Sequence, residues 1–314
     1  MVTASNVAAR HHTVPRLYLR RFADSNRRSK YPQVWVTDGH NGARRPASVT
    51  NTSVSKDFYG PFEEVLAAHI DTTRMGELFD RVEQGDAFGM SGEDLGDILF
   101  YLALQLTRTP AFRGAVDDML QLNANEALRV DPRPQAKGLL RDMEMLALVS
   151  PPSEFVPRML STAVGVYHEL AAMKIVIVRA PAGQFFVTSD TPVAVGPLAA
   201  DETECHGLRE DFLVFPLSPR TCLTMSHHLP RHGYLEKASP DDGTRVHALT
   251  TEINRLVCRR AQRWIYSHRQ DAADTLELRF PLDRFRTITR RLGAGIVQTV
   301  DLLLPGGSLS GEDS

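Results

Sequence analysis

The chain has 314 residues, of which 42% are hydrophobic and 24% are charged, the composition of an ordinary globular protein. Its formal net charge of −2 gives no overall field that would draw the chain to nucleic acid or to a membrane. Its three cysteines are odd in number and widely spaced, which excludes a disulfide framework and a CxxC metal site.

The first fifty residues form a basic N-terminal segment. They contain nine arginine or lysine residues against two aspartates, a charge of +7 that leaves −9 for the rest of the chain. This asymmetry indicates either an anionic partner or docking of the segment on the acidic body. Residues 1–10 carry little pattern, and we expect a flexible terminus there. Residues 33–38 (QVWVTD) predict a strand, and residues 39–46 predict a loop.

The middle of the chain, residues 61–172, has the apolar spacing of helices. Pro61 marks a helix start, and Ser91 is a candidate N-cap for a second helix. In that second helix Leu95, Leu99 and Leu102 recur at helical spacing. Pro110 predicts a kink or a new turn. Further helices are predicted at residues 113–127, 136–149 and 153–171.

The part of the chain over residues 173–267 is rich in strands. Two strand pairs are predicted, a hairpin of 174–180 with 184–189 and a pair of 211–218 with 221–226. A helix over 244–262, a strand over 263–267 and a disordered tail over 305–314 follow. Helices and strands are segregated, so we predict the α+β class. We expect a single domain over residues 11–280, with the helical central region packed on a small, mostly antiparallel sheet.

The usual cofactor and hydrolase motifs do not occur in the sequence. It has no P-loop, GxGxxG, GxSxG or HExxH pattern, and we predict neither a cofactor nor a metal site. The first ten residues lack the apolar core of a secretory signal. No stretch approaches the ~20 apolar residues of a membrane span. We therefore expect a cytoplasmic protein without membrane attachment; the sequence does not indicate its oligomeric state.

Separated stretches of the chain carry a family resemblance. HHTVPRLYLRRFA (11–23), LQLTRTP (104–110), FFVTSDTPV (185–193) and FPLSP (215–219) occur in this order, and INRLVCRRAQRWIYS closes the set at residue 267. Together they resemble the domain-of-unknown-function 4238 family of bacterial proteins over residues 11–267. The resemblance implies an intracellular bacterial context and assigns no reaction. It implies recurrent polar positions at His11, His12, Arg16, Gln105, Arg108, Ser189 and Asp190.

A polar stripe lies on the helix that follows Ser91. Tyr101, Gln105 and Arg108 are spaced i, i+4 and i+7, beside the leucine face. A buried charge needs a partner, and Asp190 offers a carboxylate that matches an arginine fork. This pair is either a structural latch between the helices and the strands or part of a functional cleft. Asp190, which follows Ser189 at a strand end, is either a turn cap or a general base.

The histidines and arginines of residues 11–23 also allow two interpretations. His11 and His12 are either packed and hydrogen bonded or act as acid and base near neutral pH. Adjacent residues of an extended chain point to opposite sides, which argues against a shared metal ion. Arg16 and Arg20 share a face if the segment is helical, and we expect them to point inward, toward Gln105, Arg108 and Asp190.

These residues combine into one hypothesis and one alternative. In the hypothesis, an anion-binding cleft acts on a phosphate-bearing or nucleic-acid substrate, with hydrolysis by a phosphodiesterase-like mechanism as one candidate reaction. The catalytic candidates are His11, His12 and Asp190, and the substrate-binding candidates are Arg16, Arg20, Tyr101, Gln105, Arg108 and Ser189. In the alternative, the same residues form a structural latch in a non-enzymatic protein that binds a protein or nucleic acid.

Overall fold

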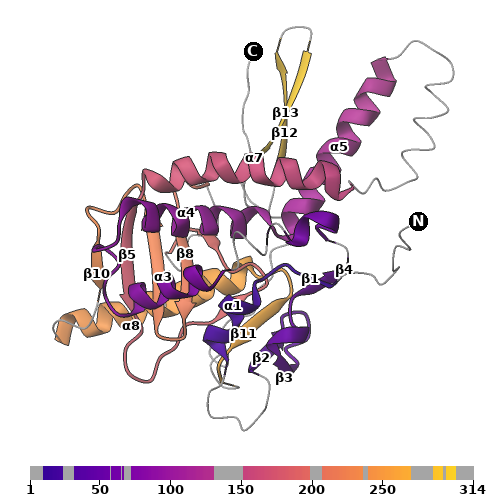
Figure 1. Ribbon diagram of the computed structural model, residues 1–314. Helices are drawn as coiled ribbons and strands as arrows, with labels where there is room; N and C mark the ends of the chain where they lie inside the picture. Colours follow the sequence, from indigo (N-terminus) through magenta and orange to yellow (C-terminus); the bar gives the residue numbers. More distant parts are fainter. Residues whose placement is uncertain are drawn as a thin grey trace.

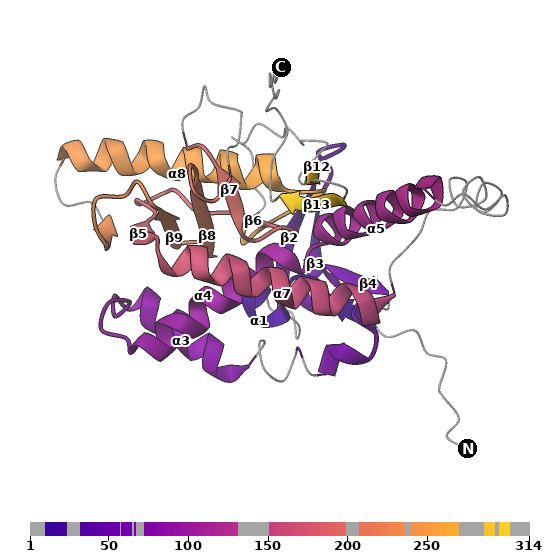
Figure 2. The same ribbon diagram turned by 90° about the horizontal axis from the view of Figure 1, so that it is seen from above.

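The computed structural model describes ten stretches of the chain (Figures 1 and 2). They are residues 10–23, 32–56, 58–64, 66, 72–130, 151–198, 207–235, 240–269, 286–292 and 295–301. The predicted helix at 136–149, the predicted tail at 305–314 and residues 1–9 of the predicted flexible terminus lie outside them.

A five-stranded sheet forms the centre of the described structure. Its strand order is β10-β5-β9-β8-β7, and all neighbours are antiparallel except β10 and β5. The strands are β5 (Lys174–Arg179), β7 (Ala194–Gly196), β8 (Phe212–Ser218), β9 (Thr221–Ser226) and β10 (Gly233–Leu235). The predicted pairing of 211–218 with 221–226 is confirmed, since β8 and β9 are hydrogen bonded.

Helices cover both faces of this sheet. Figure 2 shows α8 (Pro240–Arg260) on one side, and α3 (Thr73–Glu83), α4 (Gly92–Thr107) and α7 (Pro152–Ala171) on the other. Side chains alternate along a strand, so Ile177 of β5 packs with the α3–α4–α7 side and Val178 packs with α8. This arrangement of segregated helices and mostly antiparallel sheets confirms the predicted α+β class.

A second sheet has four strands. Its order is β3-β2-β11-β6, with every neighbouring pair antiparallel. The strands are β2 (Gln33–Asp38), β3 (Arg44–Ser48), β6 (Thr188–Ser189) and β11 (Trp264–Ser267). A two-stranded pair of β1 (Arg10–His12) and β4 (Val54–Lys56) lies beside it. The 3-10 turn η2 (Val49–Asn51) lies between β3 and β4 in the chain. The helix α1 (Arg16–Leu19) and the 3-10 turn η1 (Arg20–Phe22) follow β1. The predicted strand at 33–38 matches β2.

Several helix boundaries follow the predicted signals. The Ser91 side chain accepts the backbone N–H of Asp94, as its N-cap assignment requires. Pro110 begins α5 (Pro110–Val130), and Pro152 begins α7. Pro61 lies instead in a 3-10 turn, η3 (Gly60–Phe62). A hairpin of β12 (Arg286–Leu292) and β13 (Gly295–Asp301) was not predicted.

The predicted hairpin of 174–180 with 184–189 is wrong. The first stretch, β5, pairs with β9 and β10, whereas β6 pairs with β11 in the other sheet. The connecting residues run between the two sheets. Asn254 of α8 satisfies their backbone, accepting from the Val187 N–H at 3.0 Å and donating to the Phe185 carbonyl at 2.8 Å. A helix side chain thus replaces the ladder partner that the hairpin would have supplied.

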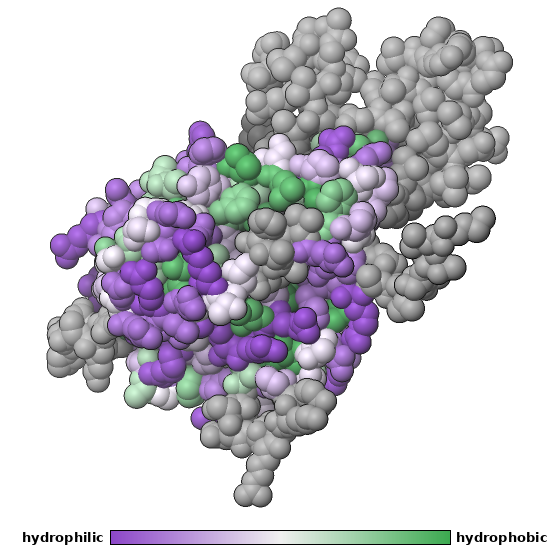
Figure 3. Space-filling view, in the orientation of Figure 1, coloured by the Kyte–Doolittle hydropathy of each residue, from purple (hydrophilic) through white to green (hydrophobic). Residues whose placement is uncertain are grey.

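The surface seen in the view of Figure 1 is mostly polar. Figure 3 shows hydrophilic residues over most of this face and hydrophobic residues gathered over α7, where Val164 is 47% exposed. Within the described residues, none of the helices has the length and apolar character needed to cross a bilayer.

Candidate functional site

The β1–β4 pair anchors a buried polar cluster of His11, Tyr59 and Arg108. His11 is buried, accepts the Tyr59 backbone N–H on Nδ1 at 2.8 Å and stacks on the Tyr59 ring. Arg108 ends α4 and is 2% exposed. Its guanidinium donates to the His12 carbonyl at 2.9 Å and to the Tyr59 hydroxyl at 3.1 Å, and it lies over the Tyr59 ring. The helix end is thereby tied to the N-terminal strand.

His12 is partly buried among positive charges. Its Nδ1 lies 3.1 Å from the Thr52 carbonyl, and because a carbonyl only accepts, this nitrogen carries the proton. Burial, followed by the charge of Arg16, lowers the pKa of His12 from 6.5 to about 4; Arg10 and Arg108 add smaller effects in the same direction. The imidazole is therefore neutral at pH 7.

The rest of the predicted helix stripe points into the core. Tyr101 is buried and packs edge-on against Phe79. Gln105 is fully buried, and its amide nitrogen and oxygen form no hydrogen bond with any residue the structure describes. The sequence placed this stripe at the edge of the core, whereas Tyr101 and Gln105 lie inside it.

The arginines of α1 and η1 do not point as expected. Arg16 and Arg20 are exposed, so the predicted inward orientation of this pair is wrong. The short helix buries Tyr18 and Leu19 instead. Arg21 is the arginine of this group that turns inward, pairing with Asp80 at 2.7 Å and with Glu83 of α3.

Ser189 and Asp190 hold the junction between α8 and β11. The Ser189 hydroxyl donates to the Thr191 carbonyl at 2.8 Å and accepts the Thr191 N–H at 3.1 Å, a local turn. The Asp190 carboxylate accepts three consecutive backbone N–H groups, from Gln262, Arg263 and Trp264, at 2.7–3.0 Å. Asp190 therefore caps backbone N–H groups of a loop distant in sequence, whereas the sequence predicted capping of nearby N–H groups. The catalytic role of Asp190 stays a prediction.

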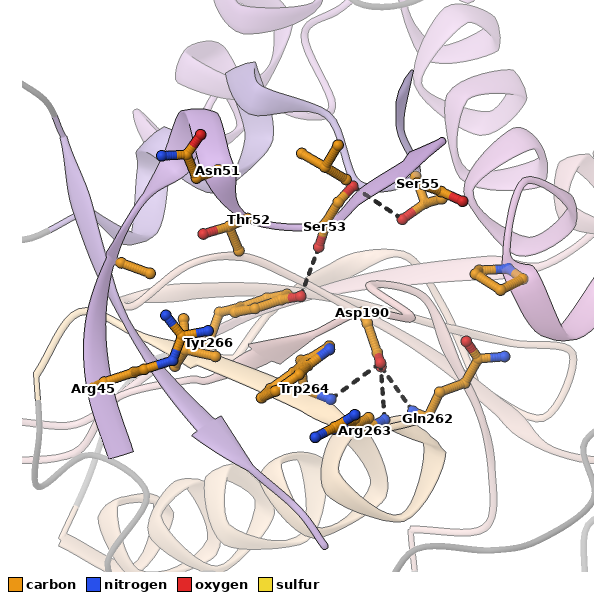
Figure 4. Close-up of a pocket in the computed structure, with 15 residues that line it drawn as sticks. Arg45, Asn51, Thr52, Ser53, Ser55, Asp190, Gln262, Arg263, Trp264 and Tyr266 are labelled. Atoms are coloured by element: carbon orange, nitrogen blue, oxygen red, sulfur yellow. Dashed lines mark hydrogen bonds between the residues drawn. The ribbon is translucent and has the colours of Figure 1, made fainter. Parts of the chain in front are cut away.

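A pocket of ≈ 380 Å³ lies between the four-stranded sheet and the η2–β4 segment (Figure 4). The register aligns Tyr266 of β11, Val36 of β2 and Arg45 of β3 on one face of the sheet, which forms the floor. The opposite face of β11 carries Ile265, which packs with the α8 core. The other lining residues are Thr13, Ala47, Asn51, Thr52, Ser53, Val54, Ser55, Pro110, Asp190, Gln262, Arg263 and Trp264.

Two hydroxyls meet at the centre of this pocket. Ser53 and Tyr266 are joined by a hydrogen bond of 2.6 Å between Oγ and Oη, and Figure 4 shows the two side chains pointing toward each other. Burial raises the pKa of Tyr266 well above its usual value, so the phenol is neutral. Ser53 has a φ of 55°, the left-handed region that non-glycine residues seldom adopt. Such conformations cluster at functional sites.

Two arginines line the pocket, and they differ in whether a described residue pairs with them. Arg263 is half-exposed, is paired with Asp38 at 2.9 Å and stacks on the Trp264 ring. This pairing lowers the pKa of Asp38. Arg45 is exposed and forms no hydrogen bond or ion pair with any described residue. Figure 4 places Arg45 and Asp190 on either side of Tyr266.

The predicted site residues and the pocket overlap in part. Asp190 lines the pocket, and Thr13 and Pro110, close neighbours of His12 and Arg108, line it too. The N-terminal segment, the end of α4 and the TSDTP turn therefore do meet. The sequence reasoning missed Arg45, Ser53 and Tyr266. Alternation in RWIYS could have placed Trp264 and Tyr266 on one strand face, but nothing in the sequence paired them with Ser53.

Within the described residues, no group of three or more histidine, cysteine or acidic side chains is arranged to hold a metal ion.

Comparison with known proteins gives one result. Searches of the curated proteins and of the solved structures found no match. A family model described as "Protein of unknown function (DUF4238)" matches residues 10–271, which is most of the chain. The chain belongs to the DUF4238 family.

Proposed function

We propose that the protein binds an anionic, phosphate-bearing ligand in the pocket between the four-stranded sheet and the η2–β4 segment. The observation that carries the proposal is Arg45, a lining guanidinium with no hydrogen bond or ion pair to any described residue. An arginine fork matches the oxygens of a phosphate and binds them through paired, charge-assisted hydrogen bonds.

The rest of the lining supports the same ligand chemistry. Hydroxyls of Ser53 and Ser55 lie along the opposite wall, where they can donate to phosphate or sugar oxygens. The Asp190 carboxylate would repel an anion, but it lies across Tyr266 from Arg45 and three backbone amides hold its charge. The phosphate group therefore belongs at the Arg45 end of the pocket.

The contacts favour binding over hydrolysis. Both Asp190 oxygens accept backbone N–H groups, and the His12 Nδ1–H is engaged by the Thr52 carbonyl. Hydrolysis by His11, His12 and Asp190 remains the alternative role of the site. An assay of bis(p-nitrophenyl) phosphate, with and without divalent metal ions, separates the two: turnover that His12→Ala abolishes without lowering the melting temperature would support hydrolysis.

Binding can be tested with the chain's own fluorescence. The two tryptophans are Trp35 and Trp264, and Trp264 lines the pocket. Titration with orthophosphate and with adenosine monophosphate should change Trp264 emission and saturate. Arg45→Gln should weaken binding by about tenfold or more, since a hydrogen bond to a charged group contributes about 1.5–3 kcal/mol.

The matched control is Lys174→Gln, which removes one exposed positive charge at the start of β5, in the other sheet. It should leave binding unchanged. Equal weakening by both variants, or no saturable binding by the wild-type protein, would overturn the proposal.

A further inference from the structure

The β1–β4 pair ends in two like charges placed opposite each other. Arg10 and Lys56 are direct partners in the antiparallel register, and both are exposed. Directly opposite residues of such a pair have Cβ atoms about 4.5–5.5 Å apart, and like charges there are destabilising. An anion bound between the two cations would be attracted to both and would offset their mutual repulsion.

This charged pair adjoins the pocket. Lys56 follows the lining residue Ser55, and the Arg10 guanidinium donates to the side-chain oxygen of Asn51, another lining residue, at 3.1 Å. Arg45 lies in the same lining. Positive charge therefore continues from the pocket along the outer end of the β1–β4 pair.

His12 lies within the same basic region. It is flanked by Arg10, Arg16 and Arg108, and each of these charges opposes its protonation. Arg16 is exposed beside it. The strip of Arg10, Lys56 and Arg16, defined here as the basic strip, is thus a concentration of positive charge on a chain whose net charge is −2.

We propose that the basic strip and the pocket together bind single-stranded nucleic acid, with one nucleotide in the pocket and the adjoining phosphates on the strip. This inference rests on the proposed function, because it takes the phosphate at Arg45 as part of a longer strand. Recognition of single strands combines a positively charged track with aromatic groups that contact the bases.

The pocket distinguishes this partner from other polyanions. Its floor holds the partly exposed ring of Trp264, and its walls hold hydroxyls that can pair with base edges or sugar oxygens. A nucleobase is an aromatic ring with hydrogen-bonding edges, whereas the acidic side chains of a peptide and the phosphate headgroups of an anionic membrane carry no aromatic ring. Bases of a duplex are stacked and paired and would have to leave the stack to reach this site, whereas bases of a single strand are already accessible.

The test uses the full chain and a fluorescently labelled ten-nucleotide single strand, as DNA and as RNA, with anisotropy measured from 50 to 200 mM salt. Affinity should exceed that for adenosine monophosphate. The logarithm of the binding constant should fall linearly with the logarithm of salt concentration, by about 0.7 for each phosphate contacted.

Arg10→Glu is the decisive variant, because it converts the like-charge pair with Lys56 into an opposite-charge pair and should not unfold the protein. We expect strand affinity to fall about tenfold or more and the salt slope to become flatter, while adenosine monophosphate binding falls by clearly less, since Arg10 reaches the pocket only through its hydrogen bond to Asn51. Arg158→Glu on the exposed side of α7 changes the net charge equally and is the matched control.

Each outcome is decisive. If the wild-type protein binds adenosine monophosphate but the strand no more tightly, this inference fails and the proposed function stands. If it binds neither, both fail. Equal loss of strand affinity in Arg10→Glu and Arg158→Glu, or full competition by polyglutamate of matched charge, would also overturn the inference, since binding would then follow charge alone.

Discussion

Ser53 combines an unfavourable backbone conformation with two sets of hydrogen bonds. Its φ is 55°, its carbonyl accepts from the Thr13 N–H at 3.0 Å and the Thr13 hydroxyl at 3.3 Å, and its own hydroxyl meets Tyr266. A left-handed conformation costs a non-glycine residue about 1–2 kcal/mol. Glycine would avoid that cost but would remove the hydroxyl that Ser53 supplies to the pocket.

This reasoning predicts the stability of two variants. In a Tyr266→Phe background the serine hydroxyl has already lost its phenol partner, so Ser53→Gly then mainly removes backbone strain. We expect the double variant to be about 1 kcal/mol more stable than Tyr266→Phe alone in urea unfolding. Ser53→Ala in the same background keeps the strain and is the control. Equal stability of the glycine and alanine variants would show that the conformation is not strained.

At the residue scale, the sequence predicted which groups need partners better than it predicted the partners. Arg108 is buried at the end of α4, whereas Gln105 is buried in the core with no hydrogen bond to any described residue. Arg108 donates to the His12 carbonyl, and Asp190 accepts three backbone amides. Partners of this kind are main-chain atoms, which every residue possesses, and no sequence pattern marks which of them a fold brings near.

The short helix α1 explains why arginines alternate with apolar residues near the N-terminus. Tyr18 is fully buried and stacks on Phe215 of β8. Its hydroxyl donates to the Pro216 carbonyl at 2.6 Å and is bonded to the Thr188 hydroxyl at 2.7 Å. One side chain therefore ties α1 to a strand from each of the two large sheets, while the exposed arginines keep the opposite side of the helix in water.

Tyr18→Phe tests this tie between elements. The change removes only the hydroxyl and leaves the Pro216 carbonyl and the Thr188 hydroxyl buried with one partner fewer. We expect a loss of about 1–3 kcal/mol in the free energy of unfolding, measured by urea denaturation. Tyr167→Phe in α7, a partly buried tyrosine, loses the same atom and should change stability by less than about 0.5 kcal/mol. Similar losses in both would argue against the tie.

At the element scale, local signals located helix starts and most strands but not every pairing. Ser91, Pro110 and Pro152 act through the backbone of their own turn, so their effect is visible in sequence. The pairing of β5 and β6 with different sheets depends on contacts with α8, 67 residues or more away along the chain. Taken without the rest of the chain, two adjacent β-rich runs predict a hairpin. The long-range contacts with α8 override this local preference.

At the scale of the whole molecule, the same two sheets bound two hydrophobic cores. The larger core combines residues of α3, α4 and α7 with Val34 and Val36 of the four-stranded sheet and one face of the five-stranded sheet. The smaller core lies between α8 and both sheets, through Val214 and Ile265. The segregated order of helices and strands was enough to predict the α+β class, but not a division of the strands between two sheets.

Because the same two sheets bound both cores, we predict that the chain unfolds cooperatively, as the single domain expected from the sequence would. Loss of either core exposes apolar surface that the other core needs, so neither can unfold alone at low cost. Trp35 and Trp264 both lie in the four-stranded sheet, whereas far-UV circular dichroism is dominated by the helices. We expect the two signals to give the same urea midpoint and slope. A tryptophan transition at clearly lower urea would mean that the four-stranded sheet, with its pocket, opens as a separate unit, and the chain would then hold two folding units instead of one.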